Sequence, residues 1–158
     1  TGTMLVGNMG SQSRFDYTVI GDNVNVGSRL ENLNKIYGTN ILISETTRAH
    51  LGNQLVVRKI DRVIVRGKSL TMDVYELIGK PNEVSQIQLD FVHIYENALM
   101  NYFDQQFTVA LSLFEQASQA DLVHDKTCKI LIERCKHYIK SGPPGESWDG
   151  VFLEVLKG

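Results

Sequence analysis

Short apolar runs and longer helical stripes alternate along the first half of the chain, and glycines stand at the joints between them. Such alternation is typical of an α/β or α+β domain. Residues 4–6 and 15–20 are rich in branched and aromatic side chains and flank the turn-forming residues 7–11, which predicts a β-hairpin. Three further strands are predicted from their apolar content, over residues 41–43, 55–66 and 70–78.

The most strongly patterned helix is predicted to begin at Asp22, a good N-cap residue, and to stop at Gly38. Its apolar side chains recur at helical spacing and should form one buried stripe, which consists of Val26, Leu30, Leu33 and Tyr37. A second, short helix is predicted after the strand at residues 41–43, where Ser44 provides the cap and Gly52 ends the helix.

Residues 79–83 contain two helix breakers and little apolar content, which predicts a boundary between a domain over residues 1–79 and a helical unit over residues 80–158. Three helical stripes follow the boundary: Val92, Tyr95, Leu99 and Tyr102; Phe107, Ala110, Leu111, Phe114 and Ala117; Cys128, Leu131, Ile132, Cys135 and Ile139. Pro143, Pro144 and Gly145 then separate the helices from an apolar tail that contains Trp148, Val151, Phe152 and Leu156.

Composition narrows the possible environments and partners of the 158-residue chain. A formal net charge of -2 does not indicate a basic surface for nucleic acid or a polybasic membrane anchor. The longest apolar runs are far shorter than the roughly 20 residues that cross a bilayer, so we expect no membrane contact within the chain. Cys128 and Cys135 lie about 10 Å apart along a helix, too far to bridge, and buried thiols favour a cytoplasmic location.

One motif carries a specific resemblance. Residues 7–11 read GNMGS and residues 14–31 read RFDYTVIGDNVNVGSRLE, and this pattern closely resembles the class III nucleotidyl cyclases, which include adenylate and guanylate cyclases. The likeness continues through residues 37–38, 41–44 and 65–68 and covers about half of the chain. It implies an α+β, ferredoxin-like cyclase catalytic fold with a C-terminal α-helical extension. The opening residues read as the middle of a strand, so we expect this catalytic fold to be N-terminally truncated.

Asn25 and Arg29 are the candidate catalytic residues. They lie four positions apart near the start of the predicted helix, where free N–H groups favour anions, and an arginine fork suits phosphate oxygens. From residue types alone, an exposed and solvated pair is the simpler explanation. The resemblance implies instead that Asn25 orients the ribose of the nucleotide and that Arg29 stabilises charge on the α-phosphate during attack by the 3′-hydroxyl.

Thr18 and Lys68 are the candidate substrate-binding residues. The resemblance implies that Thr18 reads the purine, and its hydroxyl can accept a hydrogen bond from the adenine amino group. Because a hydroxyl also donates, an ordinary strand threonine stays open as the alternative, and adenine is favoured over guanine. Lys68 matches a lysine that contacts the terminal phosphates, although most lysines in loops are simply solvated.

The resemblance also implies ATP as substrate, Mg2+ or Mn2+ as cofactor, and a head-to-tail homodimer whose shared site includes Thr18, Asn25 and Arg29. The two metal-binding aspartates of the family lie upstream of this chain. We therefore predict no metal ligand here, and neither Asp16 nor Asp22 matches those aspartates.

The helical tail resembles a tetratricopeptide-type repeat in the spacing of Ala98, Phe107, Ala110, Phe114 and Ala117. A packed cap and a groove that binds a protein partner both remain open for this tail. The alternative to an enzyme is a noncatalytic cyclase-like module that uses the tail for interaction. The joint presence of Thr18, Asn25, Arg29 and Lys68 favours the enzyme. Surface left bare by the absent upstream strands predicts self-association.

Overall fold

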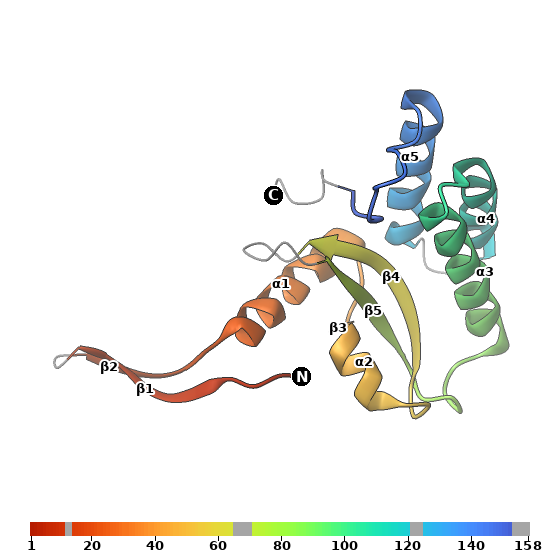
Figure 1. Cartoon of the computed structure of the whole chain (residues 1–158). Helices are drawn as coiled ribbons and strands as arrows, with labels where there is room; N and C mark the ends of the chain where they lie inside the picture. The colour runs from red at the N-terminus through yellow and green to blue at the C-terminus, as the bar shows by residue number, and fades with distance from the viewer. Residues whose placement is uncertain (12–13, 65–70, 121–124, 153–158) are drawn as a thin grey trace.

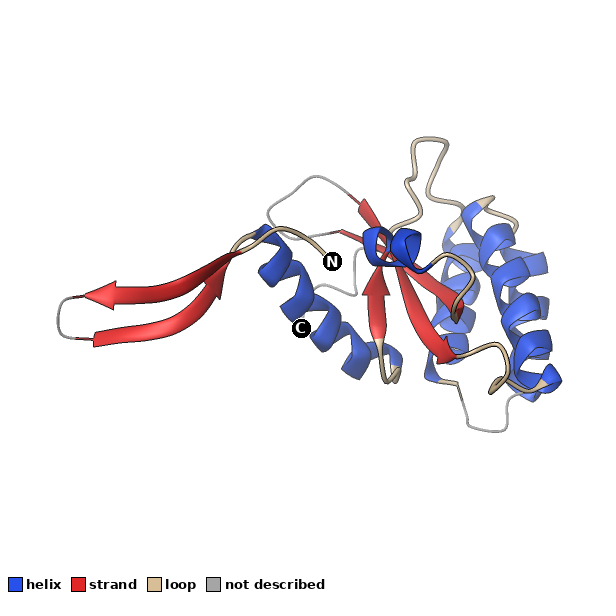
Figure 2. Ribbon diagram, turned by 90° about the horizontal axis from the view of Figure 1, so that it is seen from below, coloured by secondary structure: helices blue, strands red, loops and turns tan. Residues whose placement is uncertain are grey.

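The computed structural model describes residues 1–11, 14–64, 71–120 and 125–152 (Figure 1). The chain begins with an antiparallel hairpin of β1 (Leu5–Ser11) and β2 (Arg14–Ile20), in register from Leu5 opposite Ile20 to Ser11 opposite Arg14. The hairpin extends away from the rest of the molecule, and its base leads directly into α1 (Asp22–Tyr37), as both ribbon views show (Figures 1 and 2). The predicted hairpin is confirmed, but the predicted position of its turn is wrong: residues 7–11 belong to β1, where they pair with residues 14–18.

A second antiparallel sheet forms the centre of the molecule. It has the strand order β3 (Leu42–Ser44), β5 (Thr71–Gly79) and β4 (Val56–Ile64). The fold is therefore α+β, as expected, and each of the three strands lies within a few residues of its prediction. The strand β3 begins one residue later than predicted, and the side chain of Ile41 is 51% exposed rather than buried.

Local chemistry explains most helix ends. The helix α2 (Glu45–Leu51) starts where the Ser44 hydroxyl accepts a hydrogen bond from the Thr47 N–H at 3.3 Å, and Gly52 ends it, as predicted. Gly38 closes α1 in the left-handed conformation, with φ of 73°, and its N–H donates to the Asn34 carbonyl at 2.8 Å.

The prediction that Asp22 caps α1 is wrong. Gly21 occupies the N-cap position with φ of 149°, a conformation that suits glycine, and it has no side chain to form a cap hydrogen bond. Asp22 is instead the first helical residue, where an acidic side chain interacts favourably with the helix dipole. The apolar stripe of α1 is buried only in its second half, at Leu33 and Tyr37.

The second half of the described chain is helical, as expected. Its three helices are α3 (Gln86–Phe103), α4 (Phe107–Ala120) and α5 (Lys126–Ser141), with α3 packed on α4 and α4 packed on α5. Their predicted stripes supply a shared core, in which Tyr95, Tyr102 and Phe114 are fully buried. Ile139 is an exception, since it is 47% exposed. Within the described ranges, none of the helices is long and apolar enough to cross a membrane.

The residues after α5 fold back over the helices. Trp148 packs edge-on against Tyr102, with ring centroids 5.3 Å apart, and Val151 is buried. A glycine is required between them at position 150, because its φ is 90° and an added Cβ would lie 2.8 Å from the Phe103 ring. The backbone carbonyl of Asp149 accepts a hydrogen bond from Arg62 of β4 at 3.0 Å. This segment therefore joins the helices to the sheet.

Both cysteines are buried thiols, as predicted. Burial raises the pKa of the Cys135 thiol to about 12, so the thiolate fraction at pH 8 should be about 10⁻⁴. We expect a thiol reagent such as Ellman's reagent to leave Cys135 unmodified in the native protein and to react at once after denaturation in guanidinium chloride. Rapid labelling of Cys135 without denaturant would contradict the buried placement of this residue.

Candidate functional site

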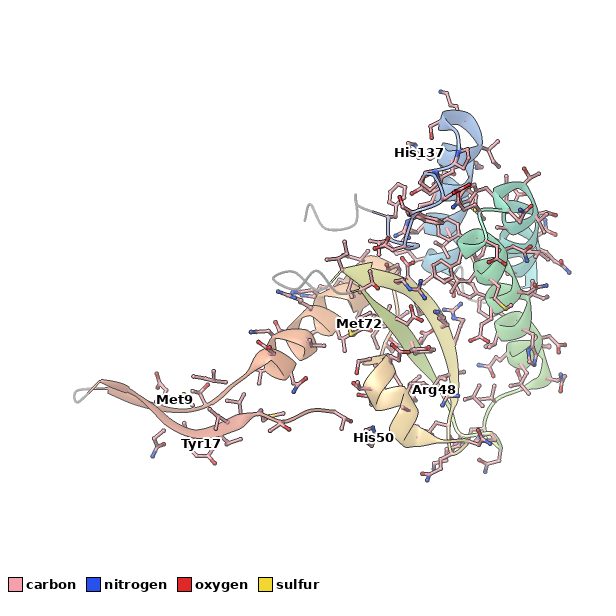
Figure 3. All side chains as sticks on the ribbon, in the orientation of Figure 1. Met9, Tyr17, Arg48, His50, Met72 and His137 are labelled. Carbon is pink, nitrogen blue, oxygen red and sulfur yellow. The ribbon has the colours of Figure 1, made fainter. Side chains whose placement is uncertain are left out.

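The hairpin β1–β2 carries the first candidate residue. Thr18 lies in β2 opposite Gly7 of β1, and its side chain is half-buried. The open space over Gly7, where an added Cβ would meet no atom within 4 Å, leaves the surface next to Thr18 accessible. Figure 3 shows Met9 and Tyr17 projecting from the same hairpin, remote from Arg48 and His50 of α2.

Asn25 and Arg29 lie in the first two turns of α1. Because they are four residues apart, their side chains leave the helix on the same side, as predicted. Asn25 is exposed and Arg29 is half-buried, and neither side chain forms a hydrogen bond or ion pair with another described residue. Both are therefore available to a ligand, close to the end of the helix where the dipole favours negative charge.

The structure brings only part of the predicted site together. Asn25 and Arg29 share one side of α1, and Thr18 lies on the strand that leads into this helix through Gly21. No hydrogen bond joins Thr18 to either residue among the described residues. Lys68 lies outside the described residues. In one chain the candidate site is thus an exposed surface rather than a closed pocket.

The hairpin presents a large apolar surface beside these residues. Its exposed apolar side chains, including Tyr17 at 76%, lie on both faces and come from both strands and the residue before them: Met4, Leu5, Val6, Tyr17, Val19 and Ile20. Exposed apolar side chains in this number are typical of an interaction surface. The self-association expected from the sequence stays a prediction.

The opposite end of α1 is fixed by a buried charged cluster that the sequence analysis missed. The Tyr37 hydroxyl donates to Oδ2 of Asp61 in β4 at 2.6 Å, and Nη1 of Arg134 in α5 donates to the same oxygen at 2.6 Å. All three side chains are at most 3% exposed. We call this arrangement the Tyr37–Asp61–Arg134 link.

Burial and the charge of Asp61 keep the Tyr37 hydroxyl and the Arg134 guanidinium protonated. Burial, together with the negative charge of Asp61, raises the pKa of Tyr37 well above its ordinary value, so the hydroxyl remains a donor. Burial alone would lower the pKa of the Arg134 guanidinium, but the Asp61 charge more than offsets this effect and raises it. Arg134 therefore stays a cation. One sequence signal was present, since Arg134 falls on the buried stripe of α5 with Thr127 and Leu131.

A second charged cluster joins β4 to the helices. Arg58 is buried and donates to Glu76 of β5 at 2.6 Å and to Asp125, which caps α5, at 2.5 Å. Its guanidinium also lies 4.8 and 4.5 Å from the ring centres of Phe91 and Tyr95 in α3. The helical unit is thus bound to the sheet by two buried arginines that come from opposite sides of the interface.

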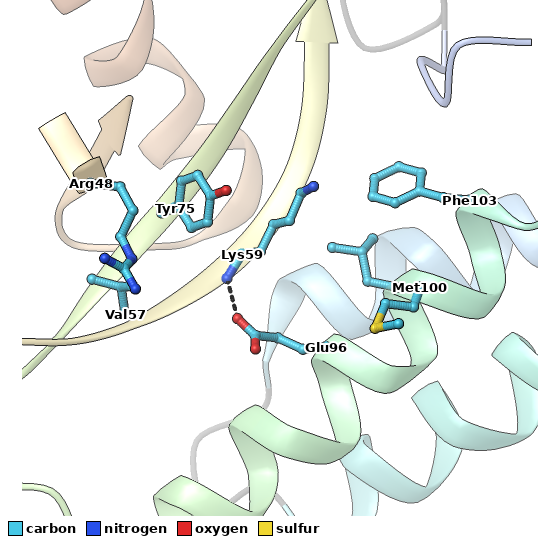
Figure 4. A pocket seen from close by; sticks show the side chains of 8 residues that line it. Arg48, Val57, Lys59, Tyr75, Glu96, Met100 and Phe103 are labelled. Carbon is cyan, nitrogen blue, oxygen red and sulfur yellow. Dashed lines mark hydrogen bonds between the residues drawn. The ribbon is translucent and has the colours of Figure 1, made fainter. Parts of the chain in front are cut away.

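Two cavities lie near this interface, and neither includes Thr18, Asn25 or Arg29. The first has a volume of about 430 Å³ between α2, the sheet and α3, where the Lys59 N–H donates to Glu96 at 2.8 Å (Figure 4). The Lys59 ammonium is paired with Asp73. The second, of about 630 Å³, lies between the end of α1, β5 and α3. The predicted site and the cavities are therefore separate features.

The described residues do not form a metal site by themselves. Among them, no group of three or more histidine, cysteine, aspartate or glutamate side chains is arranged to hold an ion. The residues present thus do not fit the divalent ion that the family resemblance implies, and we derive no step of the chemistry through a metal.

Comparison with known proteins gives a consistent result. Residues 1–79 match the family model described as the adenylate and guanylate cyclase catalytic domain. The chain is 33% identical over 145 residues to the terminal-differentiation specific adenylate cyclase of Dictyostelium discoideum, a match that covers 89% of the chain and 7% of that protein. It is 42% identical over 79 residues to adenylate cyclase 1 of Rhizobium meliloti (strain 1021), with 50% of the chain and 12% of that protein covered.

A third relative, the adenylate cyclase of Anabaena cylindrica, is 46% identical over 79 residues, which are 48% of the chain and 16% of that protein. The chain thus spans between 7% and 16% of the length of these three relatives. Among solved structures, the adenylyl cyclase CyaB from P. aeruginosa aligns with a TM-score of 0.42 and 30% identity, over 52% of this chain and 41% of that one.

Proposed function

Since this chain belongs to the adenylate and guanylate cyclase catalytic domain family, we propose that it forms the carboxy-terminal part of the catalytic domain of an adenylate cyclase. The longer protein converts ATP to 3′,5′-cyclic AMP and pyrophosphate. The observation that carries this proposal is the placement of Asn25 and Arg29 together on the exposed first turns of α1, within the matched region. All three relatives described above are named adenylate cyclases, which supports ATP as the substrate.

In this proposal each candidate residue has one role. Arg29 stabilises the charge that develops on the α-phosphate, and Asn25 holds the ribose so that its 3′-hydroxyl is aligned for attack. Thr18 accepts a hydrogen bond from the adenine amino group, and Lys68 binds the terminal phosphates. Positioning and charge stabilisation suffice for phosphoryl chemistry, which requires no covalent intermediate on the protein.

The remaining parts of the site come from outside this chain. We propose that carboxylates upstream in the longer protein hold Mg2+ or Mn2+, and that two copies assemble head to tail so that these carboxylates face Asn25 and Arg29. The apolar surface of the β1–β2 hairpin supports such an assembly, because it lies beside the candidate residues and is exposed in the single chain. The buried thiols support a cytoplasmic location.

We propose a division into a cyclase part over residues 1–79 and a helical tail over residues 80–158, which the extent of the family match supports. In the tail, α3 and α4 would correspond to one tetratricopeptide-like helix pair. The inner faces of its helices already pack on one another and on β4, which favours a packed cap over a groove for a protein partner. The noncatalytic alternative is not favoured, because the relatives described above are named adenylate cyclases.

A cyclase assay on two proteins tests the proposal. With ATP and Mn2+, we expect the longer protein to produce cyclic AMP and the isolated 158-residue chain to produce none, because the described residues offer no metal site. Cyclic AMP can be measured by chromatography after each protein is shown to be folded by circular dichroism. A folded longer protein without cyclase activity would contradict the proposed function, and an active isolated chain would contradict the proposed division of the site.

A further inference from the structure

The helix that carries Asn25 and Arg29 is held by the helical tail at its far end. Three residues of α5 make this contact: Lys126, Ile130 and Arg134. They are spaced by four, so they lie along one side of α5. The helical tail therefore contacts the C-terminal end of α1 through side chains on one side of α5.

Each of the three α5 residues uses a different kind of contact. Lys126 donates from its ammonium to the backbone carbonyl of Lys35 at 2.8 Å, in the last turn of α1 where the helix dipole favours a cation. Ile130 packs against the core cluster that contains Leu33 and Tyr37. Arg134 acts through the carboxylate of Asp61, which also accepts the hydrogen bond from the Tyr37 hydroxyl.

The approach of α5 to α1 is close enough to constrain backbone position. An added Cβ at Gly38 would lie 3.0 Å from the Cβ of Lys126, so the two helices nearly touch at this point. The first two turns of α1, by contrast, project from the body of the molecule next to the hairpin (Figure 1). One hydrogen bond from these turns runs from the Asn23 side chain to the Thr3 carbonyl, at 2.8 Å.

We propose that Tyr37 and Lys126 are positioning residues through which the helical tail sets the direction of α1 and so places Asn25 and Arg29 against the nucleotide. This inference rests on the proposed function for its catalytic consequence. A helix behaves as a rigid rod, and Arg29 lies eight residues, about 12 Å, from the anchored residue Tyr37. A small tilt at the anchored end therefore displaces the Arg29 side chain, and a displacement of about 1 Å can cost about 10²-fold in rate.

The chain offers a matched pair of double variants for the test. The test variant combines Tyr37→Phe with Lys126→Met. It removes the buried hydroxyl that α1 donates to Asp61 and the exposed lysine that α5 donates to the Lys35 carbonyl. The ion pair between Asp61 and Arg134 stays intact. The control is Tyr95→Phe with Lys129→Met. It removes a buried hydroxyl that donates to the Ile60 carbonyl at 2.8 Å, next to Asp61, and an exposed lysine on α5.

Both doubles are made in the longer protein, and two quantities are measured. We expect the Tyr37→Phe, Lys126→Met protein to lose about five- to tenfold in kcat, with KM for ATP changed by less than about twofold, because positioning matters most in the transition state. Hydrogen exchange of the backbone amides in residues 22–37 should become faster in the same protein. The control double should change neither quantity, although its loss of a buried hydroxyl costs similar stability.

Equal losses of kcat in both doubles, or an unchanged kcat in the test double, would overturn the inference. If the longer wild-type protein made no cyclic AMP, the proposed function would fail. The hydrogen-exchange measurement would still test whether the helical tail holds α1 in place. In that case faster exchange limited to the test double supports control of α1 by the tail. Exchange that is unchanged, or accelerated alike in both doubles, refutes it.

Discussion

Replacement of Arg29 by alanine in the longer protein should lower the turnover number of the proposed cyclase reaction by about 10²- to 10³-fold, while the KM for ATP changes comparatively little. The reason is that Arg29 is proposed to stabilise negative charge that develops on the α-phosphate only during the attack. A group that acts only in the transition state contributes to kcat rather than to substrate binding. Steady-state kinetics with ATP as the varied substrate measure both constants.

Two other variants make the Arg29→Ala result specific. Lys68→Ala should raise the KM and spare kcat, since contacts with terminal phosphates exist before and during the reaction. Arg48→Ala is the matched control, because Arg48 is also a half-buried helical arginine but belongs to α2 and hydrogen-bonds the Gly52 carbonyl. It should leave both constants within about twofold. A rise in KM for Arg29→Ala with unchanged kcat would show that Arg29 binds the ground state instead.

Replacement of Arg134 by methionine should cost about 3–5 kcal/mol of folding free energy, because it leaves the Asp61 carboxylate buried without a cation. This is a large share of the roughly 5–15 kcal/mol that stabilises an ordinary domain. Urea denaturation of the purified wild-type chain and the Arg134→Met chain measures the difference in their free energies of unfolding. An unchanged m-value would show that the two chains unfold in comparable transitions.

The ion pair itself can be separated from the loss of side-chain packing. Lys136→Met changes an exposed lysine on the same helix and should leave the urea midpoint of unfolding close to that of the wild type. Adding Asp61→Asn to Arg134→Met removes the orphaned charge and keeps an acceptor for Tyr37, so the double variant should recover part of the loss. If Arg134→Met alone were as stable as the Lys136→Met control, Asp61 and Arg134 would not form a buried pair in solution.

Several elements could be predicted from the sequence because their causes are local. Gly38, Ser44 and Gly52 end or begin helices through contacts with residues at most five positions away, which the sequence displays directly. The common side of Asn25 and Arg29 follows from a spacing of four in any helix. The start of α1 was misassigned because the unusual backbone of Gly21, rather than the side chain of Asp22, occupies the cap.

The features that sequence reasoning missed depend on distant partners. Asp61 and Arg134 are 73 positions apart, and helical spacing showed only that Arg134 belongs to a buried stripe, without indicating what it would face. Sequence alone also leaves open the distance between Thr18 and Asn25, because it depends on the angle at which the hairpin leads into α1. Local patterns determine the identity of the elements, whereas the pairing of charged groups between elements requires the packed structure.

The pairing of β4 with α5 also determines when this chain can finish folding during its synthesis. Asp61 leaves the ribosome 73 residues before Arg134, which corresponds to a delay of about 4 to 15 s at ordinary rates of translation. During that time the carboxylate has no cation from α5, and burying it alone would be costly. The strand β4 should therefore stay open to water until the last helix emerges. The part that matches the cyclase family thus reaches its final packing only after the helical tail has been made.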